Sequence, residues 1–207
     1  MKILKYALGQ LQANCYFLIE KNNCLIIDPA DEADFILEKI QRERLNLIAL
    51  LSTHGHFDHL MAAGEIQQSF DVPLYINKGD LFLLKKLKQN AQYFLGYQPL
   101  ILPIVNVKNL NEGWLEIENF SLKTIFTPGH TPGSVCFYFK EGMLFSGDTL
   151  FKGGIGRYDF FYSDKNKLQQ SLKKILQYPQ ETKILPGHGE ETAMDKEKPF
   201  ILKNFII

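Results

Sequence analysis

The 207-residue chain is poor in the features that mark secreted, membrane or nucleic-acid-binding proteins. It has three cysteines, Cys15, Cys24 and Cys136, which form no CxxC pair, so we expect small core side chains and no disulfide framework. Its 23 basic side chains equal its 23 acidic ones, which removes the general attraction to phosphate backbones and anionic lipid. No signal-peptide core follows the N-terminus, and the uncharged run at 89–107 contains prolines and a glycine. We therefore expect a cytoplasmic protein that binds neither nucleic acid nor a membrane.

Strand-like and helix-like segments alternate along the chain. Segments rich in β-branched and aromatic residues predict strands at 14–20, 24–28, 47–52, 120–127, 134–140 and 182–186. Helical patterns predict helices at 32–43, capped by Asp31, and at 164–178, capped by Ser163. Because hairpin-like pairs are mixed with βα units, a purely parallel sheet is disfavoured. We predict one α/β (α+β) domain over residues 1–207, with layered mixed sheets.

The segment 78–103 reads as a helix that runs into an irregular aromatic stretch. This composition is typical of a loop that covers a site, so we predict a lid here. It carries a lysine cluster, Lys85, Lys86 and Lys88, which we expect on a solvated helix face and not at a substrate.

All five histidines follow a predicted strand. Three of them lie with Asp58 in 53-THGHFDHL-60, which has the pattern H-x-H-x-D-H. Imidazole nitrogen and carboxylate oxygen suit Zn²⁺ and other first-row metals. Since one tight turn cannot aim four such groups at a single ion, the motif predicts two ions that share the turn.

Three further fragments each follow a strand and supply a metal-capable side chain: His130 in 127–134, Asp148 in 146–151 and His188 in 185–191. A glycine precedes each of these residues, which ends the strand and lets the next side chain point outward. A lone Pro-Gly-His is more often a simple turn. Together with the H-x-H-x-D-H turn, however, the fragments predict a metal site at one rim of a sheet.

These motifs, T-H-G-H-F-D-H, T-P-G-H-T-P-G-S, G-D-T-L-F and P-G-H-G, resemble those of the metallo-β-lactamase fold superfamily. Segments 147–160 and 185–192 are similar to the glyoxalase II group, particularly its short bacterial hydroxyacylglutathione hydrolase-like members. The resemblance implies a four-layer αββα sandwich with a two-metal site at one edge. It implies a first metal held by His54, His56 and His130, a second held by Asp58, His59 and His188, and Asp148 as the bridge.

Two departures bear on the substrate. Longer glyoxalase II enzymes carry a C-terminal helical extension that helps to bind glutathione, whereas this chain ends about twenty residues after His188. The identity of the thiol that carries the acyl group, glutathione or another, is therefore left open. Arg157 matches the place where the family often has a basic residue that contacts substrate, but an ion pair with Asp159 is an equal alternative.

The predicted site favours hydrolysis of a thioester. A water shared by two Zn²⁺ ions, with iron or manganese as alternatives, would have its pKa lowered from about 15.7 toward about 7. The metal-held hydroxide would attack the carbonyl directly, with Asp58 and Asp148 as catalytic residues, because no histidine is left to activate a serine or cysteine. A thiolate leaving group needs no dedicated acid. Tyr93 and Tyr97 of the predicted lid would lie against the apolar part of the substrate.

Other functions stay open on the sequence alone. A persulfide dioxygenase of similar fold would use one iron ion, and a phosphodiesterase or lactonase of the same fold would use the same ligands. From a different class, the chain could bind metal without turnover. The expected partner is only a small-molecule thioester, and the protein is expected to be a monomer or a small homo-oligomer.

Overall fold

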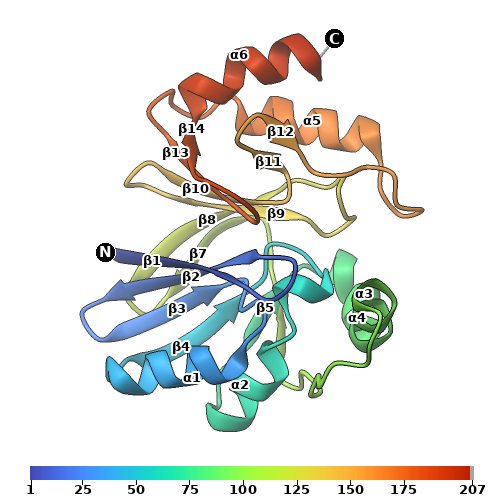
Figure 1. The fold of residues 1–207 in the computed structure, drawn as a ribbon. Helices are drawn as coiled ribbons and strands as arrows, with labels where there is room; N and C mark the ends of the chain where they lie inside the picture. The colour runs from blue at the N-terminus through green and yellow to red at the C-terminus, as the bar shows by residue number, and fades with distance from the viewer. Residues whose placement is uncertain (206–207) are drawn as a thin grey trace.

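The computed structural model describes residues 1–205 and shows two mixed sheets packed face to face, with helices on both outer sides (Figure 1). The first sheet has the order β1-β2-β3-β4-β5-β6, with β1 (Lys2–Leu8), β2 (Ala13–Glu20), β3 (Asn23–Ile27), β4 (Asn46–Leu51), β5 (Leu74–Ile76) and β6 (Val107–Asn109). The second has the order β14-β13-β10-β9-β8-β7, with β7 (Gly113–Ile117), β8 (Phe120–Phe126), β9 (Val135–Phe139), β10 (Met143–Gly147), β13 (Lys183–Pro186) and β14 (Thr192–Ala193). A small hairpin joins β11 (Leu150–Phe151) to β12 (Gly154–Ile155).

The helices cover the outer faces of the two sheets (Figure 1). The helices of the described residues are α1 (Ala33–Arg42), α2 (Ala63–Ser69), α3 (Leu81–Lys85), α4 (Leu87–Leu95), α5 (Lys165–Ile175) and α6 (Met194–Asn204), with short 3₁₀ turns η1 (Phe57–His59) and η2 (Lys78–Asp80); α3 and α4 lie to one side of the sheets. α1 and α2 lie on the first sheet, and α5 and α6 on the second. The predicted mixed-sheet αββα architecture is therefore confirmed. Across residues 1–205, no helix is both long and apolar enough to cross a membrane.

Because side chains alternate between the two faces of each strand, the buried residues form three separate hydrophobic cores. In β2, Tyr16 and Leu18 face the second sheet, whereas Cys15 and Phe17 face the α1–α2 layer. A third core lies between the second sheet and α5–α6. All three cysteines are buried and unbonded, as the sequence predicts, and each belongs to an apolar core.

All six predicted strands form, within one or two residues at each end. Both predicted helix caps are one residue early. Glu32 is the N-cap of α1, in a left-handed conformation, and Asp31 accepts a hydrogen bond from the Glu32 backbone instead. Asp164 caps α5 through Lys167 N, because the Ser163 hydroxyl donates to the His130 carbonyl.

The edge where strands end carries the site. The loops after β4, β8, β10 and β13 meet there, and the α3–α4 segment lies beside them (Figure 1). The sequence did not predict β1, β5–β7, β11, β12, β14, α2 or α6. Several of these are three-residue strands or short helices that form only where a neighbouring strand or core receives them.

Candidate metal centre

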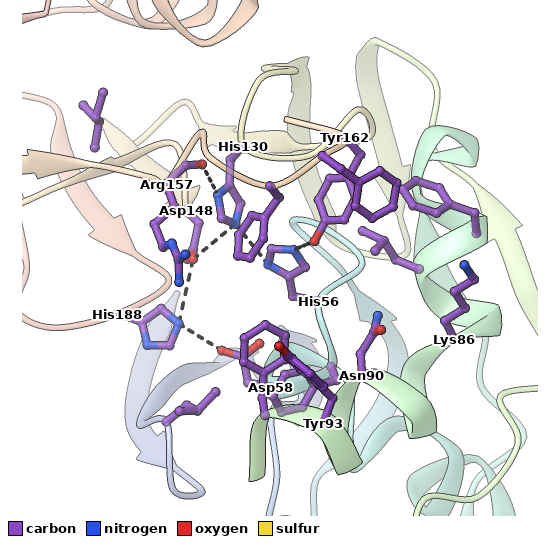
Figure 2. Close-up of a pocket in the computed structure, with 18 of the residues that line it drawn as sticks. His56, Asp58, Lys86, Asn90, Tyr93, His130, Asp148, Arg157, Tyr162 and His188 are labelled. Atoms are coloured by element: carbon purple, nitrogen blue, oxygen red, sulfur yellow. Dashed lines mark hydrogen bonds and ion pairs between the residues drawn. The ribbon is translucent and has the colours of Figure 1, made fainter. Parts of the chain in front are cut away.

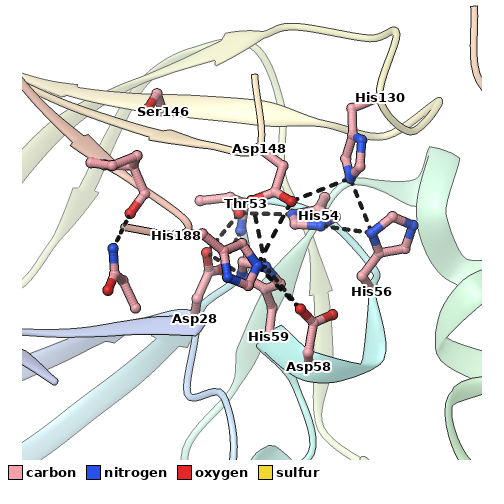
Figure 3. Close-up of polar contacts among 12 residues, drawn as sticks. Asp28, Thr53, His54, His56, Asp58, His59, His130, Ser146, Asp148 and His188 are labelled. Atoms are coloured by element: carbon pink, nitrogen blue, oxygen red, sulfur yellow. Dashed lines mark hydrogen bonds and ion pairs between the residues drawn. The ribbon is translucent and has the colours of Figure 1, made fainter. Parts of the chain in front are cut away.

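Two groups of metal-capable side chains meet at this edge (Figure 3). In the first group, His54 Nε2 and His130 Nε2 each lie 3.0 Å from His56 Nδ1. In the second group, His188 Nε2 lies 3.2 Å from His59 Nε2 and 3.2 Å from Asp58 Oδ2. The first group joins residues 74 positions apart in the chain and the second residues 129 apart, so only folding creates them.

Asp148 lies between the two groups. Its Oδ2 is 3.5 Å from His130 Nε2, and its Oδ1 is 3.6 Å from His59 Nε2. Oδ1 is buried and has no hydrogen-bond partner in the described part of the chain. A buried, unpaired carboxylate oxygen is costly unless a cation compensates it. The arrangement therefore fits divalent metal ions, and the nitrogen and oxygen donors suit zinc, iron and manganese.

Close backbone approach keeps Asp148 in place. A Cβ atom on Gly187 would lie 2.3 Å from Asp148 Oδ1, so only glycine fits between β13 and this carboxylate. The Pro-Gly before His188 thus ends the strand and also leaves room for the Asp148 carboxylate.

Asp28 fixes the tautomers of two histidines from behind the site (Figure 3). Its Oδ2 accepts hydrogen bonds from His59 Nδ1, at 3.0 Å, and from Thr53 Oγ1, at 2.7 Å. Because Thr53 gives its only hydroxyl proton to Asp28, it accepts from His54 Nδ1 at 3.0 Å. Both imidazoles therefore carry a proton on Nδ1, which leaves Nε2 for a cation.

Sequence analysis missed Asp28 because it reads as the last residue of a strand. In the structure it follows β3 with φ of 51°, a left-handed conformation that aspartate tolerates better than most residues. The only signal in the sequence was an aspartate at a strand end, which is common in turns.

The other two histidines of the first group have separate outer partners. His130 Nδ1 donates to the Arg157 carbonyl at 2.8 Å, and His56 Nε2 lies 2.8 Å from the Tyr162 hydroxyl. The Tyr162 ring is stacked on Phe160, with 5.4 Å between ring centroids. Sequence analysis did not single out Tyr162, although the aromatic run at 160–162 directly follows the segment that contains Arg157.

We expect Tyr162→Phe to weaken cation binding by the first group about tenfold and to leave the second group unchanged. The change removes the oxygen that orients His56 and keeps the ring. Chelator competition, resolved into two binding steps, measures both affinities. Tyr158→Phe, in the same loop, is the matched control and should have no effect. Equal weakening of both steps would contradict this selective role.

Asp80 connects the α3–α4 segment to the metal-binding loops. Its buried carboxylate accepts hydrogen bonds from Gly55 N at 2.8 Å, Gly133 N at 2.7 Å and Thr131 Oγ1 at 2.6 Å. One side chain thus joins the loop of His54 and His56 to the loop of His130.

The two groups differ in charge. Burial, with the neighbouring imidazoles, lowers the pKa of His56 to about 3 and holds the pKa of His54 well below 6.5. Burial also acts to lower the pKa of His59, but three nearby carboxylates outweigh it and raise that pKa to about 10. In protein stripped of cations, His54 and His56 are therefore neutral near pH 7, whereas His59 is protonated.

This difference predicts proton release when stripped protein takes up a cation. His59 must lose a proton to bind, so the affinity of the second group should rise about tenfold per pH unit from pH 7 to 9 and level off above pH 10. His54 and His56 of the first group, which are already neutral, should release no proton. Calorimetric titration in buffers of different ionisation enthalpy measures the protons released. A pH-independent second step would show that His59 is already neutral.

The site opens into a pocket of about 730 Å³ (Figure 2). Its walls are mostly aromatic and aliphatic and come from the loop at 151–162, from Leu11 and from the α3–α4 segment, which the sequence predicted to cover a site. Side chains of both metal-binding groups line its floor.

Of the three residues predicted to contact substrate, two line the pocket and one does not. Tyr93 lines the pocket, and Arg157 lines it while its guanidinium donates two hydrogen bonds to Asp159, at 2.9 and 2.8 Å. Tyr97 is not among the lining residues, because α4 ends at Leu95 and Gly96 turns the chain at φ of 76°. Lys86 is exposed, as expected, and it also lines the pocket.

Two stacked mixed sheets with histidine and aspartate donors at one edge define a metal-dependent hydrolase fold. The profile of the Metallo-beta-lactamase superfamily matches residues 8–188, and the chain belongs to this superfamily. The chain is 39% identical to the probable metallo-hydrolase YqgX of Bacillus subtilis, over 97% of this chain and 98% of YqgX. It is 37% identical to the hydroxyacylglutathione hydrolase GloC of Haemophilus influenzae, over 92% of this chain and 93% of GloC.

Two solved structures are close in both fold and sequence. A di-iron-bound form of TTHA1623 has a TM-score of 0.87 and 37% identity, covering 94% of this chain and 96% of TTHA1623. The B3 metallo-beta-lactamase BLEG-1 has a TM-score of 0.83 and 33% identity, covering 96% of this chain and 97% of BLEG-1. Together with the donor groups, the di-iron neighbour supports a dinuclear divalent-metal site.

Proposed function

We propose that this chain is a binuclear hydrolase of the glyoxalase II type that cleaves hydroxyacylglutathione-like thioesters. The observation that carries the proposal is Asp148, placed within 4 Å of nitrogens from both groups at the floor of a pocket. The named activity of GloC supports the substrate class. His54, His56 and His130 would hold one cation, Asp58, His59 and His188 the other, and Asp148 both.

A bound cation pair would supply an acidified water and polarise a carbonyl oxygen. The chain's own residues do the rest. Outer hydrogen bonds fix the histidines, and the aromatic walls offer an apolar surface to the substrate. Asp58 lines the pocket, and His59 and His188 lower the pKa of its carboxyl although burial acts to raise it. It is therefore a carboxylate at neutral pH that could accept a hydrogen bond from the attacking water and orient it.

A thioester suits this pocket better than an amide. A leaving thiolate has a conjugate acid of pKa about 8.5 and departs without a proton donor. An amine leaving group needs one, and burial raises the pKa of Tyr162 to about 12, so that this phenol keeps its proton. The β-lactamase BLEG-1 makes β-lactam cleavage the second candidate.

The deciding experiment uses protein stripped of metal and reloaded with Zn²⁺ or Fe²⁺. We expect hydrolysis of S-lactoylglutathione, abolished by chelator and restored by metal, with two ions per chain by elemental analysis. Hydrolysis of the β-lactam nitrocefin at a higher kcat/KM would favour the second candidate. One iron per chain with oxygen consumption on a persulfide would favour the dioxygenase. If the protein binds two ions tightly but turns over none of these substrates, the enzymatic proposal is rejected.

A further inference from the structure

Two polar side chains on one wall of the pocket have no partner in the protein. Lys86 lies between α3 and α4, and Asn90 follows one helical turn later in α4; both line the pocket (Figure 2). Within residues 1–205, neither side chain forms a hydrogen bond or an ion pair. Lys86 is exposed and Asn90 half-buried, so two hydrogen-bond donors at this wall are free of protein partners and available to a ligand.

The second cation of the pocket is already engaged. The Arg157 guanidinium makes a two-pronged contact with Asp159 and lies 4.6 Å from the centroid of the Phe160 ring. This pair carries no net charge. Of the lysine and arginine side chains that line the described pocket, only Lys86 therefore offers an uncompensated positive charge.

The surrounding wall is apolar. Phe82 and Leu83 lie just before Lys86, and Tyr93 and Phe94 follow Asn90 on α4. An apolar wall with a few unpaired donors selects a ligand that has an apolar body and one well-placed acceptor group. An ammonium beside an amide suits a carboxylate, because the hydrogen bond from the ammonium is charge-assisted.

We propose that Lys86 and Asn90 form a carboxylate-binding subsite, so that the preferred substrate is a thioester whose acyl group is apolar and ends in a carboxylate. This inference rests on the proposed thioesterase function and concerns only the preferred acyl group, so that a small hydroxyacyl thioester such as S-lactoylglutathione would be hydrolysed but would not be the best substrate. The reacting carbonyl would lie at the floor, beside Asp58 and Asp148, and the acyl group would extend along the α3–α4 wall to Lys86.

The kinetic test compares two thioesters of the neutral thiol N-acetylcysteamine, with 3-phenylpropanoyl and 3-(4-carboxyphenyl)propanoyl as acyl groups. For the metal-loaded enzyme, we expect a KM about fivefold lower for the carboxylated substrate. Lys86→Met should abolish this preference with kcat within about twofold, and Lys86→Arg should retain it. Lys85→Met is the matched control, because Lys85 neighbours Lys86 in the chain but does not line the pocket. This variant should behave as the wild type.

A binding measurement separates this inference from the proposed function. Thioether analogues of the two substrates cannot be hydrolysed, and their affinities for the metal-loaded protein follow from calorimetry. Tighter binding of the carboxylated analogue, lost in Lys86→Met, supports the subsite even if no thioester is turned over, in which case the proposed function alone fails. Equal binding of both analogues overturns the subsite, even if both thioesters are hydrolysed. The subsite is also overturned if Lys86→Met changes KM equally for both substrates, or if Lys85→Met changes it as much as Lys86→Met does.

Discussion

Replacement of Asp148 by alanine is expected to release both metal ions together and to lower hydrolysis by at least about a thousandfold. This carboxylate lies between the two groups, with its Oδ2 3.5 Å from His130 Nε2 and its Oδ1 3.6 Å from His59 Nε2. Without its negative charge, two cations a few ångströms apart would repel each other with less compensation. Elemental analysis after gel filtration gives the ions per chain.

Asp58→Ala is the control, since Asp58 belongs only to the second group. The Asp58→Ala variant should keep one ion per chain, whereas the Asp148→Ala variant should keep none. Asp148→Asn, which preserves the shape of the side chain, guards against simple misfolding and should also lose both ions. If either Asp148 variant retains two tightly held ions, Asp148 is not the bridge.

Asp28→Asn is expected to weaken both metal sites, by about 10- to 100-fold each, although Asp28 lies outside both donor groups. The variant replaces the oxygen that accepts from His59 Nδ1 and Thr53 Oγ1 with an amide that can only donate. His59 must then move its proton to Nε2. Thr53 must donate to His54 instead, which has the same consequence there. Asparagine tolerates the positive φ at this position, so the backbone should stay in place.

Two measurements check the Asp28 prediction. Chelator competition should show both binding steps weakened, and nitrogen NMR of the stripped protein should show a proton on Nε2 of His54 in the variant and on Nδ1 of His54 in the wild type. Asp31→Asn changes an aspartate three residues later, outside this network, and should have neither effect. Loss at the second site alone would mean that Thr53 does not relay the change to His54.

The substrate wall was the least predictable part of the site. The sequence placed Tyr97 in the pocket, whereas the structure leaves it outside. Lys86 is exposed, as the sequence predicted, and it also lines the pocket. The helical segment breaks between α3 and α4 and ends at Gly96, and each break rotates the following side chains by an amount that periodicity does not specify. Arg157 pairs with Asp159, one of the two alternatives that the sequence left open, and its contact with substrate stays a prediction.

The sequence by itself determined which side chains are available to bind metal and that they follow strands, because H-x-H-x-D-H and the three Gly-His or Gly-Asp fragments are local patterns. It also determined the alternation that separates the cores on the two faces of β2. Only the tertiary structure decided that Asp148 lies between the two groups, that Asp28 sets the protons of His54 and His59, and that Tyr162 reaches His56. These contacts join residues as far as 106 positions apart, and a hydrogen bond depends on distances and directions that exist only once the sheets have packed.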